Sequence, residues 1–286
     1  MSARSITCRT RWQNRRCDSS KSDIFFSRQY GSNTIFNNFE VMQVLNSVKL
    51  LKTRQLKIGI HQPYFLPYIA YFALINAVDK FVLADDLQYE RRSWINRNRI
   101  KVQGNWQYIT IPVKKAPQTT PINKIELASL ESFAWTLRRT LEANYGSCPY
   151  FHEVQDLVFD SIGHETNLSE LNIALIMRIC DYLGINTPIY ISSKLNYYPS
   201  ETKEYRIRNI CNSLGCTEYV NSIGGTDLYS KDDFSKLNLS LGFIKIHDIV
   251  YPQGKNGFIP NLSIIDVLMW NSVEDVRKML NDHSIL

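Results

Sequence analysis

Three side chains with acid–base chemistry follow two short apolar runs in the first third of the sequence. His61 comes directly after Ile58–Ile60, and the carboxylates Asp85 and Asp86 come directly after Lys80–Ala84. Both runs have the composition of buried strands. A histidine that titrates near neutral pH and is oriented by a carboxylate is the usual general base of enzymes. We therefore predict that His61, Asp85 and Asp86 are catalytic residues.

A structural role is the alternative for each of these three side chains. A single histidine often makes only a local hydrogen bond, and a carboxylate often caps a turn or pairs with a nearby arginine. Because Asp85 and Asp86 are adjacent, their side chains point to opposite faces of a strand, so at most one faces a given site. Two carboxylates without further acidic ligands are a weak pattern for a metal site, and we predict no bound metal.

A segment rich in basic and amide side chains follows the second apolar run. It contains Arg92, Asn96, Arg97 and Arg99. Guanidinium groups match phosphate oxygens in a bidentate way, and amides bind hydroxyl groups or the edge of a base. For any one arginine a solvated, charged turn is an equally good explanation, but this explains the whole cluster less well. We predict that these four residues, with Gln62 beside the histidine, contact a substrate.

A pair of glycines follows the later strand pattern Glu218–Ser222. Glycine lets backbone amides approach an anion closely, and we include Ser222, Gly224, Gly225 and Tyr229 among the predicted substrate-binding residues. The segment matches neither a Walker loop nor the GxGxxG dinucleotide motif. On spacing alone, an ordinary turn explains it equally well.

Strand and helix patterns alternate along the chain, and these elements must position the candidate residues. The strand patterns are Ile58–Ile60, Lys80–Ala84, Trp106–Val113, Asn123–Leu127, Thr187–Ser192, Glu218–Ser222 and Phe243–Val250. The helix patterns are Tyr68–Ala77, Glu131–Tyr145, Val154–Ser161, Leu168–Leu183, Arg206–Leu214, Leu262–Asn271 and Ser272–Asn281. This order predicts an α/β fold, with a mostly parallel sheet flanked by helices and a helical insertion in the middle of the chain. Parallel strands end at one edge of a sheet, which would bring His61 and Asp85 into one cleft.

The composition indicates a folded protein with little affinity for nucleic acid. The chain has 286 residues, of which 44% are hydrophobic and 21% charged, and its net charge is +6. Residues 1–41 carry seven of the 33 basic residues and three of the 27 acids, so the remaining chain is nearly neutral. Nucleic-acid binding needs clustered basic groups. We predict no such partner.

The first 41 residues lack apolar periodicity and are rich in Arg, Ser and Asn. We interpret them as a disordered or misassigned extension, with a transit-type presequence as the alternative, and residues 42–286 as a single domain. The six cysteines form no CxxC motif, and no signal peptide is visible, so we expect a cytoplasmic protein. No apolar run is long enough to span a bilayer.

Several segments of the chain together resemble one family. They are HQPYFLPYIAYFALINAVDKFVLADDLQYERRSWINRNRI, NSLGCTEYVNSIGGTDLY, YPQ and LSIIDVLMWNS, and the resemblance covers roughly Lys57 to Asn271. Their succession is similar to the WbqC-like family of bacteria. The motifs QPxFxPxxxYF, DDxQ and WxNRNxI carry most of this resemblance, and the family usually has glycine where this chain has Ala70.

The resemblance implies a role in the synthesis of O-antigen or other surface polysaccharide. Proteins of this family are described as transferring an acyl or aminoacyl group, glycine in some descriptions, to an amino sugar. The implied partners are a nucleotide-linked sugar and an activated acyl or aminoacyl donor; no cofactor or oligomeric state is implied. The alternatives are a nucleotidyltransferase-like enzyme and a non-catalytic protein that binds sugar nucleotides in a polysaccharide assembly pathway.

Overall fold

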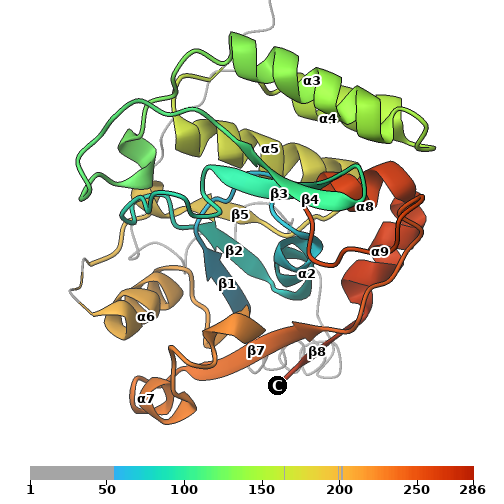
Figure 1. The fold of residues 1–286 in the computed structure, drawn as a ribbon. Coiled ribbons are helices and arrows are strands. Elements are labelled where there is room, and N and C mark those ends of the chain that lie inside the picture. Colours follow the sequence, from blue (N-terminus) through green and yellow to red (C-terminus); the bar gives the residue numbers. More distant parts are fainter. Residues whose placement is uncertain (1–54, 164, 199, 201) are drawn as a thin grey trace, which may run out of the picture. The chain divides into compact units, whose positions relative to one another are not determined.

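A six-stranded sheet lies at the centre of the structure, a computed structural model that describes residues 55–163, 165–198, 200 and 202–286 (Figure 1). Its strands, in spatial order, are β5 (Ile189–Ile191), β2 (Lys80–Leu83), β1 (Lys57–His61), β6 (Glu218–Ser222), β7 (Ser240–Ile246) and β8 (His283–Ile285). All neighbouring pairs are parallel except β7 and β8. This arrangement confirms the predicted α/β fold class with a mostly parallel sheet.

Strand β1 lies in the middle of the sheet, between β2 and β6. Its central residues are buried, as expected for a parallel strand that is covered on both faces. Gly59 is required in this strand, because a Cβ atom at this position would lie 2.8 Å from the ring of Phe81. The absence of a side chain therefore allows the phenylalanine of β2 to pack across β1.

Helices cover both faces of the sheet. One buried cluster joins apolar residues of α2 (Ile69–Ala77), α8 (Ile264–Trp270) and α9 (Val273–Asn281) to Phe81 and Leu83 of β2. A second cluster joins α6 (Lys203–Ser213) and α7 (Lys231–Lys236) to Val82. Since Val82 lies between Phe81 and Leu83 and points to the opposite side of β2, the two clusters lie on opposite faces.

The predicted helical insertion consists of α3 (Glu131–Tyr145), α4 (Phe151–Phe159) and α5 (Leu168–Leu183), which follow one another between β4 (Asn105–Thr110) and β5 (Figure 1). Helix α5 begins and ends where its sequence predicts. The side chain of Asn167 accepts hydrogen bonds from two backbone N–H groups of the first turn. Gly184 ends the helix in the left-handed conformation, with φ of 66°.

A separate antiparallel pair is formed by β3 (Arg97–Val102) and β4 (Asn105–Thr110). The sequence predicted β4 but missed β3, whose alternating polar residues do not form an apolar run. The predicted strand Asn123–Leu127 is wrong, because the single 3₁₀ turn η2 (Ile122–Lys124) follows Pro121 there. After this turn, residues up to Leu127 form only isolated β-bridges within the described part of the chain, one of them between Leu127 and Val113. The other predicted elements are present, with ends that differ by a few residues.

Residues Gln55–Leu286 form one compact unit. The predicted extension 1–41 and the boundary at residue 42 lie outside the described residues, so the domain assignment stays a prediction. Within the described part of the chain, no helix is long and apolar enough to cross a membrane.

Candidate functional site

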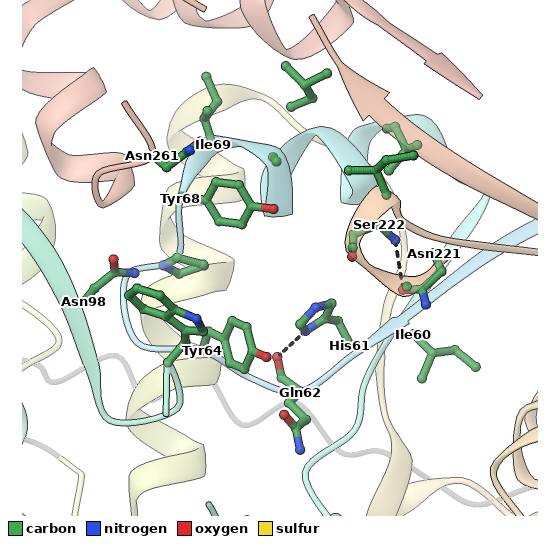
Figure 2. Close-up of a pocket in the computed structure, with 18 of the residues that line it drawn as sticks. Ile60, His61, Gln62, Tyr64, Tyr68, Ile69, Asn98, Asn221, Ser222 and Asn261 are labelled. Carbon is green, nitrogen blue, oxygen red and sulfur yellow. Dashed lines mark hydrogen bonds between the residues drawn. The ribbon is translucent and has the colours of Figure 1, made fainter. Parts of the chain in front are cut away.

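A cavity of about 1220 Å³ opens where β1 and β6 end (Figure 2). From β1 the sheet continues to β2 and β5 on one side, whereas β6 leads to β7 and β8 on the other. This is the topological switch point of the sheet, where open α/β folds bind ligands beyond the carboxyl ends of the strands. The volume exceeds the roughly 300–1,000 Å³ that is typical of small-molecule sites, so the cavity accommodates a large ligand.

His61, the last residue of β1, and Gln62, in the loop that follows, both line this cavity. At Leu66 the backbone takes a left-handed conformation, with φ of 42°. The buried side chain of Asn98 holds this turn, because its Nδ2 donates to the carbonyl oxygens of Phe65, at 3.1 Å, and Leu66, at 2.7 Å. Asn98 thus connects β3 to the loop that follows His61, a role that the sequence did not indicate.

His61 lies in an aromatic environment. Its ring makes edge contacts with Tyr64 and Tyr71, at centroid distances of 4.6 and 5.0 Å. Burial lowers the pKa of His61 to about 4, and this effect exceeds the opposing effect of the hydrogen bond with Gln62. The ring is therefore neutral at pH 7.

The tautomer of His61 follows from its contact with the backbone. Nδ1 lies 3.3 Å from the carbonyl oxygen of Gln62, which also accepts a hydrogen bond of 2.8 Å from the Tyr71 hydroxyl. A carbonyl oxygen can only accept, so we assign the hydrogen to Nδ1. The other ring nitrogen, Nε2, is then an unprotonated acceptor on a residue that lines the cavity. This is the state that a general base requires.

The two predicted catalytic carboxylates are bound elsewhere, and in the described part of the chain neither hydrogen-bonds to His61. Asp85 is buried and accepts hydrogen bonds from the hydroxyl groups of Ser192 and Ser193, at 3.0 and 2.6 Å. It also accepts one from the backbone N–H of Ser193, at 2.9 Å. Asp85 therefore connects the end of β2 to the 3₁₀ turn η3 (Ser192–Lys194). It lies outside the lining of the cavity.

Asp86 forms an ion pair with Arg206 of α6, at 2.6 Å, and accepts a hydrogen bond of 2.8 Å from the Tyr197 hydroxyl. Ser192 also donates to it. Burial raises the pKa of Asp86, but these hydrogen bonds and the charge of Arg206 outweigh burial and lower that pKa below its ordinary value. The carboxylate is therefore ionised at neutral pH, and its contact to the cavity is indirect, through Arg206.

The predicted arginine and asparagine residues divide into two groups. Arg99 lines the cavity, donates to the carbonyl oxygen of Asn261 at 3.0 Å and stacks near Trp94. Three others lie outside the lining. Arg97 stacks on Tyr108 at 4.1 Å, the buried Asn96 donates to the carbonyl oxygen of Ile111 at 3.1 Å, and Arg92 is exposed. The structure thus brings Arg99 to the site but assigns Arg97 and Asn96 to the β3–β4 ribbon.

The glycine pair does lie at the cavity, together with Ser222 and Tyr229. Gly224 and Gly225 belong to the 3₁₀ turn η4 (Ile223–Gly225), directly after β6. A Cβ atom on Gly225 would lie 2.2 Å from Nδ2 of Asn221, a buried side chain whose Oδ1 accepts a hydrogen bond of 2.8 Å from the Ser222 N–H. Gly225 is therefore required for the close packing of this turn.

Sequence reasoning missed several residues of the lining. Among them are Tyr64, Tyr68, Glu90, Asn98, Lys203, Arg206, Asn221, His247, Tyr251, Phe258 and Asn261. The helical spacing of Lys203, Arg206 and Ile207 could have indicated one shared face of α6. The residues after β7 offer no such pattern, because only the fold brings that loop beside β1. Among the residues that the structure describes, no group of three or more His, Cys, Asp or Glu side chains is placed to hold a metal ion.

Comparison with known proteins assigns the chain to a family. Residues 62–278 match the WbqC-like protein family. The chain belongs to this WbqC-like family. It is 34% identical over 217 residues to the uncharacterized protein Rv1507c of Mycobacterium tuberculosis, an alignment that covers 74% of this chain and 92% of that protein. No solved structure matches the chain. The family predicted from the motifs is confirmed, and the matched range contains the cavity lining from Gln62 to Val267.

Proposed function

We propose that this WbqC-like protein transfers an activated acyl or aminoacyl group, such as glycyl, to the amine of a nucleotide-linked amino sugar. The observation that carries the proposal is the neutral His61, which lines a large cavity at the switch point of the sheet and leaves Nε2 free to accept a proton. The cytoplasmic synthesis of O-antigen or other surface polysaccharide is the setting that the family resemblance implies.

The proposed reaction begins when the sugar amine attacks the carbonyl carbon of the donor. A C–N bond forms, and the carbonyl becomes a tetrahedral oxyanion. His61 Nε2 takes a proton from the nitrogen and returns it to the leaving group as the bond between carbonyl carbon and leaving group breaks. The nitrogen of the amine becomes much more acidic once it is bonded to the carbonyl carbon. A neutral imidazole can therefore take its proton at this step.

The oxyanion of this intermediate needs hydrogen-bond donors that are already in place. The candidates on the cavity lining are the backbone amides of Gly224 and Gly225 and the guanidinium of Arg99. Such donors stabilise charge that develops only in the transition state, and removing one typically costs about 10²–10³ in rate. The close packing of Gly225 against Asn221 supports the backbone amides of Gly224 and Gly225 as these donors.

The test is a transfer assay with the full-length protein. UDP-, dTDP-, GDP- and CMP-linked amino sugars are incubated with acyl and aminoacyl thioesters, and the mass of the sugar nucleotide is followed. We expect an amide product from one combination, and a rate about 10²–10⁴-fold lower for His61→Gln. His152→Gln is the matched control, because His152 is exposed on α4.

Two outcomes would refute the proposal. Binding of a sugar nucleotide without any product, across all donors, would indicate the non-catalytic alternative. An unchanged rate in His61→Gln would remove the histidine from the chemistry and require another base.

A further inference from the structure

Helix α6 contributes a cationic wall to the cavity. Lys203, Arg206 and Ile207 all belong to the lining and lie on one face of the helix, at positions i, i+3 and i+4. Lys203 is also the first residue of this helix of 11 residues, where the positive end of the helix dipole adds to its charge. The lysine side chain is exposed and can therefore contact a ligand.

Arg206 is held in a fixed orientation. Its side chain is only 15% exposed, and one of its nitrogens, Nη2, donates to Asp86 at 2.6 Å. The guanidinium also lies 5.8 Å from the centre of the Tyr197 ring. A guanidinium carries five N–H donors in a planar fork, so a single bond to Asp86 leaves others for a ligand. Such a preorganised arginine binds an anion with little loss of side-chain freedom.

The charged residues of the lining are Glu90, Arg99, Lys203, Arg206 and Asp248. Arg206 is paired with Asp86, so Lys203 is the unbalanced positive charge that α6 adds to the lining. Glu90 lies on the side of Tyr64: burial and the charge of Glu90 together raise the pKa of that tyrosine to about 12. Since Tyr64 packs on His61, the negative charge of Glu90 lies on the histidine side of the cavity.

This polarity fits the two charged ends of a nucleotide-linked amino sugar. Resting on the function proposed above, we infer that Lys203 and Arg206 bind the diphosphate of the substrate, which leaves its amine on the side of His61 and Glu90. The arginine fork and the point charge of the lysine, one turn apart, offer one cationic group to each phosphate. In this inference Lys203 and Arg206 contact the phosphate groups, in place of Arg97 as predicted from the sequence.

The inference is tested by binding rather than by turnover. The dissociation constants of UDP, dTDP, GDP and CDP, and of the four nucleosides without phosphate, are measured by calorimetry on the full-length protein. The variants are Lys203→Ala and Arg206→Lys, the second of which keeps a positive charge beside Asp86 so that the fold is preserved. Arg208→Ala is the matched control on α6, since this side chain lies outside the lining and near Tyr205.

We expect the wild-type protein to bind at least one diphosphate more tightly than its nucleoside. Both variants should weaken that diphosphate by about 10- to 100-fold, the usual effect of losing a hydrogen bond to a charged group, and leave nucleoside binding unchanged. Wild-type affinity for the diphosphate in both variants would overturn the inference and leave the proposed function standing. Failure of all four diphosphates to bind the wild-type protein would also overturn the inference, whereas the proposed function is refuted only by the transfer assay.

Discussion

His61 makes the stability of the protein depend on pH in a way that one substitution removes. Burial lowers its pKa from 6.5 to about 4. Between these two values the unfolded chain binds a proton that the folded protein does not. The stabilisation linked to His61 is therefore fully present above pH 6.5 and is lost as the pH falls through 4. At 1.36 kcal/mol per pH unit, this loss amounts to about 3 kcal/mol.

The assay is urea denaturation of wild-type protein and His61→Gln at several pH values between 7.5 and 4. Subtracting one free energy of unfolding from the other removes the contribution of groups that titrate alike in both proteins. We expect this difference to shrink by about 3 kcal/mol over the range. His61→Phe, which keeps a ring against Tyr64 and Tyr71, should show the same change, whereas His152→Gln should follow the wild-type curve.

A constant difference between wild type and His61→Gln at all pH values would refute this reasoning. It would mean that His61 takes up its proton equally in the folded and unfolded states. The ring would then be hydrated rather than enclosed by its aromatic neighbours. The assignment of a neutral base with a free Nε2 would fail with it.

Substitutions at four further positions test how the site is held. Asn98→Ala should lower the free energy of unfolding by about 1–3 kcal/mol, because it leaves the buried carbonyl group of Phe65 without a donor, whereas that of Leu66 keeps the hydroxyl of Ser263; Asn98→Asp should cost more, since a carboxylate would face both oxygens. Denaturation measures both, and equal stability to wild type would contradict the role of Asn98. Asp85→Asn should cost about 1–3 kcal/mol through its serine contacts and leave the transfer rate of the folded protein near wild type. A rate as low as that of His61→Gln, with no additional loss in the double variant, would instead support a catalytic pair. Gly225→Ala should lower the transfer rate by about 10²–10³, because its added atom displaces Asn221 and disturbs the glycine amides, and Gly224→Ala, whose added atom meets open space, should lower it less. The transfer assay compares the two, and equal rates would show that the turn tolerates a side chain.

The sequence by itself determined the sheet and the place of the site. Strands β1 and β2 contain short apolar runs, and such runs need burial on both faces, which a parallel sheet between helices provides. Because parallel strands end at one edge, the sequence indicated that His61 and the Ser222–Gly225 segment lie at the same edge of the sheet. They are neighbours there because β1 and β6 are adjacent in the strand order. Both lie at the cavity, and so does Gln62.

Only the tertiary structure decided which polar side chains face the cavity and which hold the fold. Asp85 meets Ser192 across 107 positions of the chain, and Asp86 meets Arg206 across 120. A buried carboxylate takes whichever donors the packed elements bring within reach, and no local pattern contains that information. The same holds for α6: its spacing shows that Lys203 and Arg206 share a face, but only its packing on the sheet turns that face toward the cavity.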